Sequence, residues 1–134
     1  MSQTRSQVTQ ENSEWSTAYV NRKHLLDLDD FSHQEIKQVL QITDAMKEVL
    51  NRDIKKVPPL RGKVVVTLFY EPSTRTRISF EEAGKVLSAE IINMSGSGSS
   101  MEKGESLLNT ALTLQAMGVD IIVLRHPHSG APNF

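Results

Sequence analysis

The chain has 134 residues, with 15 lysine and arginine residues against 16 aspartate and glutamate residues, and therefore a formal net charge of -1. This length accommodates one domain with its own core, and the near-neutral charge excludes an overall basic field that would attract nucleic acid or an anionic membrane surface. Because cysteine is absent, disulfide frameworks, thiolate nucleophiles and cysteine-bound zinc are excluded.

The first twenty residues are polar, rich in serine, threonine, glutamine and glutamate, and show no sustained apolar periodicity. We therefore expect a flexible arm over residues 1–20, followed by one domain over residues 21–134. The arm lacks the basic start and apolar core of a secretion signal, and no apolar run approaches the roughly 20 residues needed to cross a bilayer. We expect a cytoplasmic location without a membrane partner.

A capping box and a valine run define the first two elements of the domain. Ser32 with Glu35 has the capping-box spacing, and apolar residues then recur at helical intervals, which predicts a helix over about residues 32–51. The segment 63–70 contains three consecutive valines and predicts a strand that is buried on both faces. Such strands are typical of parallel sheets.

Helices and strands then alternate along the rest of the chain. A helix is predicted to begin near Thr74, and a strand follows over residues 90–94. After a glycine and serine loop, a helix over about residues 104–117 precedes a strand over residues 120–124. The alternation predicts an α/β domain with a parallel sheet flanked by helices. The apolar residues expected to point inward from the helix that begins at Thr74 are Ile78, Phe80, Ala83 and Leu87.

Three polar loops follow the predicted strands, at residues 71–77, 95–103 and 125–130. Because ligands of such sheets bind beyond the carboxyl ends of the strands, all three loops are expected at one binding edge. The chain then stops at Phe134 without another strand. We therefore expect an incomplete domain.

The loop at residues 71–77 has the composition of a phosphate site. Arg75 can donate two parallel N–H bonds to a phosphate, and neighbouring hydroxyls and the amides of a helix start can donate more. The simpler interpretation is a helix N-cap followed by a solvated charged face, but a cap needs only one hydroxyl. The hydroxyl-bearing residues of this site are Ser73, Thr74 and Thr76.

The other two loops carry weaker signals. Met101 and the order Lys103-Gly104 break both the dinucleotide and the Walker templates, so nucleotide binding is not predicted. Arg125 follows a buried strand and can polarise a carbonyl oxygen, neutralise a phosphate or form an ion pair at the rim. His126 and His128 are not accompanied by a nearby carboxylate or thiolate, so no metal site is predicted.

These segments resemble the aspartate and ornithine carbamoyltransferase family, in which a Ser-x-Arg-Thr-Arg signature binds the phosphate of carbamoyl phosphate. The run 69–81 (FYEPSTRTRISFE), the segment 99–106 with Lys103-Gly104-Glu105 and the segment 120–130 with Arg125-His126-Pro127 are similar to the aspartate branch. Ornithine enzymes usually lack that lysine. The resemblance covers residues 21–134 and implies part of a carbamoyl phosphate-binding domain, with the aspartate-binding domain absent.

The resemblance implies a role for each matching residue. The residues that would bind carbamoyl phosphate are Ser73, Thr74, Arg75, Thr76 and Arg125. Arg125 would reach both the phosphate and the carbonyl oxygen, and it would act in catalysis together with Arg75 and Lys103. Ser99 and Lys103 would act in a neighbouring subunit of a homotrimer, whereas Arg77 would have a structural role.

The reaction implied is attack by the amine of L-aspartate on carbamoyl phosphate, giving N-carbamoyl-L-aspartate and phosphate in pyrimidine synthesis, without a cofactor. The family histidine and glutamine that touch the carbamoyl group would lie beyond Phe134, so the chain alone is expected to be inactive. Two alternatives stay open: another carbamoyltransferase, such as an ornithine-specific one, and a truncated binding or assembly module without activity. The sequence also leaves open whether a regulatory chain or a dihydroorotase is a further partner.

Overall fold

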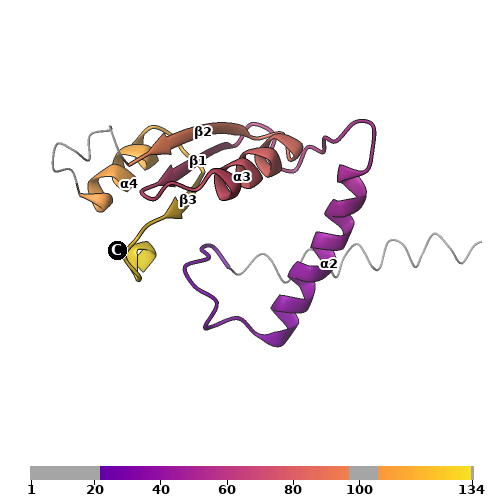
Figure 1. Ribbon diagram of the computed structural model, residues 1–134, viewed down its shortest axis with the longest axis horizontal. Helices are drawn as coiled ribbons and strands as arrows, with labels where there is room; N and C mark the ends of the chain where they lie inside the picture. The colour runs from indigo at the N-terminus through magenta and orange to yellow at the C-terminus, as the bar shows by residue number, and fades with distance from the viewer. Residues whose placement is uncertain (1–21, 97–105, 134) are drawn as a thin grey trace, which may run out of the picture. The chain divides into compact units, whose positions relative to one another are not determined.

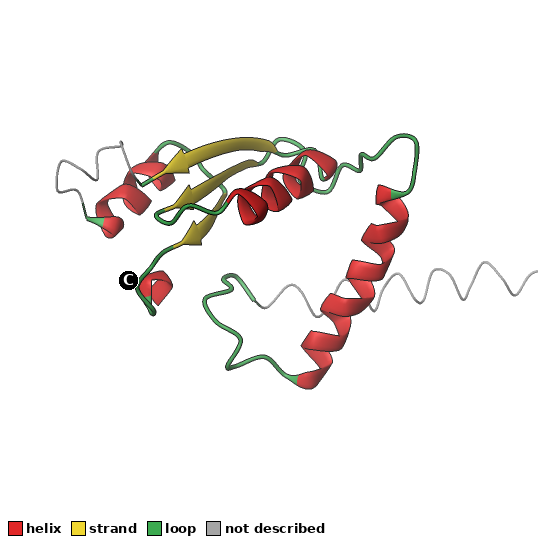
Figure 2. Ribbon diagram, in the orientation of Figure 1, coloured by secondary structure: helices red, strands yellow, loops and turns green. Residues whose placement is uncertain are grey.

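The computed structural model of the protein describes residues 22–96 and 106–133. The chain forms two compact units, Met1–Met46 and Lys47–Phe134, and Figure 2 shows their helices and strands. The predicted arm at residues 1–20 lies outside the described residues. Among the helices that are described, none has the length and apolar character needed to span a membrane.

The predicted capping box starts helix α2 (His33–Leu50). The Ser32 backbone N–H donates to Glu35 Oε2 at 2.8 Å, and the Glu35 backbone N–H donates to Ser32 Oγ at 3.2 Å. The Arg22 guanidinium bonds to two carboxylates beside this cap. Its Nη2 donates to Glu35 Oε1 at 2.9 Å, and its Nη1 donates to Asp30 Oδ1 at 2.8 Å. The helix predicted from residue 32 to residue 51 is therefore confirmed, and Arg22 ties the preceding segment to its first turn.

We predict that acid weakens this cap. The Ser32 backbone N–H and the Arg22 guanidinium lower the pKa of Glu35 to about 2, from an ordinary value of 4.5. Because the folded pKa is the lower one, the cap stabilises fully above pH 4.5, and this contribution is lost as the pH falls toward 2. Carbon-13 NMR of the Glu35 carboxyl should give a midpoint near pH 2 that rises toward 4.5 in Arg22→Gln. An unchanged midpoint in that variant would show that the guanidinium does not contribute.

The second unit contains a three-stranded parallel sheet. Its strands are β1 (Val64–Phe69), β2 (Glu90–Ser95) and β3 (Ile121–Arg125), and their order is β2-β1-β3. Thr67 of β1 pairs with Asn93 on one side and with Val123 on the other. The predicted α/β class and parallel sheet are confirmed, and β1 is the central strand (Figure 1).

Helices cover both faces of β1, which explains its burial. Val66 and Leu68 form the hydrophobic core with Leu114 of α4 (Leu107–Ala116). On the opposite face, the Thr67 hydroxyl bonds to Asn93, which in turn bonds to α3 (Thr74–Val86). Every residue of β1 after the first is buried, as the valine run predicts for a strand between two helical layers.

The inward face expected for α3 is wrong. Ile78 and Phe80 are 54% and 44% exposed, and Ala83 is also exposed. The buried residue of α3 is Gly84, and a Cβ there would clash with Ile91 Cδ1 of β2. Since the helix approaches the strand closely at a glycine, the stripe that contains Gly84 faces the sheet.

The carboxyl ends of the three strands are held in line by backbone bonds beyond the strands themselves. The Tyr70 N–H donates to the Arg125 carbonyl at 2.8 Å, and the Gly96 N–H donates to the Phe69 carbonyl at 2.7 Å. A Cβ at Gly96 would lie 2.5 Å from Tyr70 Cδ1, so a side chain does not fit there without movement. This alignment brings the β1–α3 junction, the end of β2 and the start of the loop after β3 to one edge.

Candidate functional site

The β1–α3 junction lies at this edge. Ser73 occupies the N-cap position of α3, but its side chain makes no capping bond. Its hydroxyl instead donates to Thr76 Oγ1 at 2.8 Å. Within the described part of the chain, the N–H groups of Thr74, Arg75 and Thr76 therefore have no acceptor, and the helix start can donate them to an anion.

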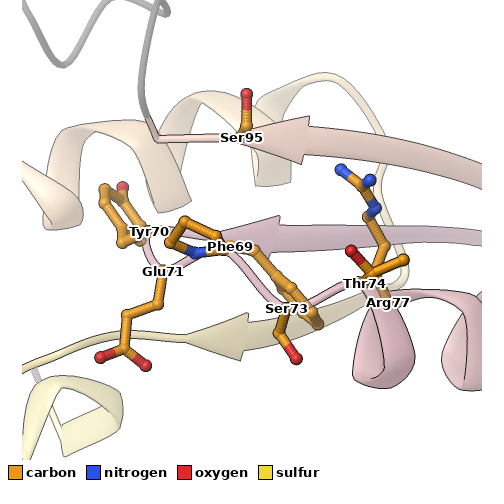
Figure 3. Close-up of a pocket in the computed structure, with 8 residues that line it drawn as sticks. Phe69, Tyr70, Glu71, Ser73, Thr74, Arg77 and Ser95 are labelled. Carbon is orange, nitrogen blue, oxygen red and sulfur yellow. The ribbon is translucent and has the colours of Figure 1, made fainter.

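A pocket of about 300 Å³ opens beside the junction. Residues 69–74 line most of it, and Arg77 of α3 and Ser95 of β2 complete the wall (Figure 3). The Arg77 side chain extends from α3 toward β2. Hydroxyl groups, a guanidinium and a carboxylate thus surround a space large enough for a small anion.

The structure brings some of the predicted residues together and separates others. Ser73 and Thr74 line the pocket, whereas Thr76 does not line it and accepts a hydrogen bond from the Ser73 hydroxyl. Arg75 is exposed and does not line the pocket. Its guanidinium makes no hydrogen bond or ion pair with the residues that the structure describes. Arg77, which the sequence interpretation assigns to a structural role, contributes to the pocket wall.

Arg125 reaches the same edge from β3. Its Nε donates to Glu71 Oε2 at 3.2 Å, and the two side chains are 41% and 37% exposed. Of the three roles predicted for Arg125, the structure therefore shows the ion pair at the rim. A half-exposed pair of this kind contributes roughly 0 to 1 kcal/mol, so an anion in the pocket can compete with Glu71 for the guanidinium.

Two histidines and a tyrosine adjoin Arg125. The rings of Tyr70 and His126 lie 4.8 Å apart, and those of His126 and His128 lie 5.2 Å apart. The His128 N–H donates to His126 Nδ1 at 3.1 Å, so the proton of a neutral His126 ring is on Nε2. Across the two described ranges, no group of three or more histidine, cysteine, aspartate or glutamate residues is arranged to hold a metal ion.

Sequence reasoning missed Glu71, Tyr70 and Ser95 as parts of the site. Each lies in or directly beside a loop expected at the binding edge, so position at a strand end is the signal that could have found them. Ser99 and Lys103, predicted to act in a neighbouring subunit, lie outside the described residues.

Comparison with known proteins identifies the family of the chain. A family model described as "Aspartate/ornithine carbamoyltransferase, carbamoyl-P binding domain" matches residues 23–133. Two relatives named "Aspartate carbamoyltransferase catalytic subunit", from Roseiflexus sp. strain RS-1 and Chloroflexus aggregans, are 62% and 59% identical over 111 residues. These matches cover 83% of this chain and 35% and 36% of the relatives.

Solved structures give the same result. The catalytic subunit of M. jannaschii aspartate transcarbamoylase has a TM-score of 0.73 at 46% identity, covering 82% of this chain and 36% of its own. Aspartate transcarbamoylase from Trypanosoma cruzi in complex with carbamoyl phosphate has a TM-score of 0.72 at 30% identity, covering 81% and 34%. The chain spans about a third of the length of the relatives that it matches.

Proposed function

The chain belongs to the aspartate/ornithine carbamoyltransferase family, and we propose that it supplies the carbamoyl phosphate site of an aspartate carbamoyltransferase. The observation that carries the proposal is the start of α3. There Ser73 bonds to Thr76 rather than capping the helix, and the first-turn amides stay available beside a pocket. The relatives named for the aspartate reaction support aspartate as the acceptor.

Each residue of the site has a part in binding the phosphate. The Thr74 and Thr76 hydroxyls and the first-turn amides donate to the phosphate oxygens, as helix starts do for anions. The Ser73 hydroxyl gives up its bond to Thr76 Oγ1 and donates to the phosphate instead. The Arg75 guanidinium has no partner among the described residues and turns onto the phosphate from outside the pocket. Arg125 exchanges Glu71 for the substrate and reaches both the phosphate and the carbonyl oxygen.

The chemistry is nucleophilic acyl transfer. The unprotonated amine of L-aspartate attacks the carbonyl carbon, and the C–N bond forms as the carbonyl oxygen takes up negative charge. The carbonyl then re-forms as the C–O bond to phosphate breaks, and the amine nitrogen gives its proton to the departing phosphate. Arg125 offsets charge on the carbonyl oxygen, while Arg75 and the helix start offset charge on the leaving phosphate.

The proposal extends to the assembly. Ser99 and Lys103 would act in the site of a neighbouring subunit of a homotrimer, where Lys103 would add a second cation to the substrate. The product, N-carbamoyl-L-aspartate, places the reaction in pyrimidine synthesis, and a cytoplasmic location fits these substrates. The family match supports the substrates, and the pocket beside the α3 start would form the phosphate cradle of one subunit.

We predict that the 134-residue chain binds carbamoyl phosphate. Isothermal titration should give a saturable heat that inorganic phosphate suppresses, because the helix start and the arginines recognise the phosphate. Urea, which has the carbamoyl group without the phosphate, is the control and should not compete. Absence of heat from a chain that circular dichroism shows to be folded would contradict the proposal.

A further inference from the structure

We propose that Glu81 is a positioning residue that, braced by Asn93 and Thr67, holds the Arg77 guanidinium at the wall of the anion pocket. The inference rests on the proposed function in one respect, namely that the pocket binds an anion. In this proposal the Arg77 guanidinium contacts the anion directly, and Glu81 orients that guanidinium. Three sets of contacts between α3 and β2 support this role of Glu81.

The first set fixes the distance between helix and strand. Gly84 of α3 lies against Ile91 of β2, so closely that a Cβ would come within 2.8 Å of Ile91 Cγ1 and nearer still to Cδ1. Residues three and seven positions before Gly84 share its face of the helix. These are Glu81 and Arg77, so both are directed toward β2.

The second set is a chain of side-chain hydrogen bonds. Asn93 Nδ2 donates to Glu81 Oε2 at 3.0 Å, and Thr67 Oγ1 donates to Asn93 Oδ1 at 2.6 Å. Thr67 is fully buried in the central strand, so this series of hydrogen bonds begins at a side chain packed inside the sheet. Because the Asn93 amide bonds through both its oxygen and its nitrogen, its orientation is fixed and so is that of the carboxylate.

The third set involves Arg77 itself, one helical turn before Glu81. Its guanidinium lies at the pocket wall that also contains Ser95, two residues after Asn93 on the same face of β2 (Figure 3). Among the described residues it has no hydrogen bond, so its charge is available to a ligand. Glu81, one helical turn further along α3, supplies the negative charge that attracts the Arg77 guanidinium.

Electrostatics agree with this arrangement. A hydrogen bond from Lys85 Nζ, the bond from Asn93 and the nearby charge of Arg77 lower the pKa of Glu81. The carboxylate is therefore ionised at neutral pH. Lys85 Nζ donates to Glu81 Oε1 at 2.6 Å, so the other oxygen, Oε2, stays bonded to Asn93 on the side of the sheet. The Glu81 carboxylate is held on the side of α3 that faces β2, and its charge restrains the Arg77 guanidinium one helical turn away.

The test compares Glu81→Gln with Glu82→Gln in the full chain. Glu82 is the neighbouring carboxylate, exposed and without a hydrogen bond or ion pair to the described residues, so its replacement removes the same charge without touching the network. Inorganic phosphate is the probe. We expect Glu81→Gln to weaken phosphate binding about 3- to 10-fold, the range for one poorly placed charge-assisted bond, and Glu82→Gln to leave it unchanged.

A double-mutant cycle separates positioning from general support of the fold. In the Arg77→Ala background, Glu81→Gln should have no further effect on phosphate binding, because the group that it orients is gone. An equal loss in both backgrounds would overturn the proposal. Asn93→Ala, which breaks the bridge at an exposed residue, serves as a second variant and should reproduce the loss seen in Glu81→Gln.

A measurement without ligand keeps the two proposals distinct. The heteronuclear NOE of the Arg77 Nε–Hε group should fall in Glu81→Gln and stay at the original value in Glu82→Gln. An unchanged NOE in Glu81→Gln overturns the positioning role, whether or not phosphate binds. If the original chain binds no phosphate, the anion site fails, while a lower NOE still supports the role of Glu81.

Discussion

Replacing Arg75 by alanine is expected to weaken binding of carbamoyl phosphate about 10- to 100-fold. A hydrogen bond to a charged group contributes about 1.5–3 kcal/mol, and 1.4 kcal/mol corresponds to a factor of ten in affinity. Arg75 is exposed and its side chain has no partner in the described part of the chain, so no described contact of the fold depends on that side chain. The loss should therefore appear in binding and not in stability.

Isothermal titration with carbamoyl phosphate measures this loss, and urea denaturation of the same samples measures stability. Arg61→Ala is the matched control, because Arg61 is exposed in the loop before β1 and, among the described residues, bonds only through its backbone N–H, which donates to the Pro58 carbonyl. Arg75→Lys should fall between the two, since lysine keeps the charge but not the paired donors. Equal affinities of Arg75→Ala and Arg61→Ala would remove Arg75 from the site.

Replacing Leu68 by alanine is expected to lower the free energy of unfolding by about 2–5 kcal/mol. Leu68 is 1% exposed in the central strand and packs in the core with Val66 and Leu114 of α4. Truncation there removes apolar contacts and leaves a cavity between sheet and helix. Because small domains are stable by only about 5–15 kcal/mol, this change takes a large part of the total.

Urea denaturation followed by far-ultraviolet circular dichroism gives the size of the effect. Leu112→Ala is the control, since it makes the same chemical change on α4 at a side chain that is 52% exposed. Its free energy of unfolding should stay within about 0.5 kcal/mol of the original chain. Similar losses for the two variants would show that the core does not lie between β1 and α4.

For α3, the sequence predicts the start of the helix correctly but not the face that it buries. Its start at Thr74 follows from the cluster of hydroxyl residues, and the structure confirms it. Its buried face was predicted from apolar residues, yet Ile78 and Phe80 are exposed and Gly84 is buried. Apolar spacing identifies a buried face only when packing is apolar, and here a close approach at a glycine and a polar bridge to β2 decide the orientation.

The sequence by itself determined the elements of this protein and the location of the motif that we propose binds phosphate. Capping residues, valine runs and alternating helices and strands act through neighbours in the chain, so they can be read without a fold. Those local rules placed α2, β1, α3 and the loop from Glu71 to Arg77 within a residue or two of where they occur.

Only the tertiary structure decided which distant side chains meet. Arg125 contacts Glu71 across 54 positions because β1 and β3 are neighbours, and Thr67 reaches Glu81 through Asn93 because β2 pairs on the other side. Strand order and the depth to which a helix settles on a sheet depend on the packing of the whole core. No local pattern encodes them, and they are what bring a guanidinium from β3 and another from α3 to one edge.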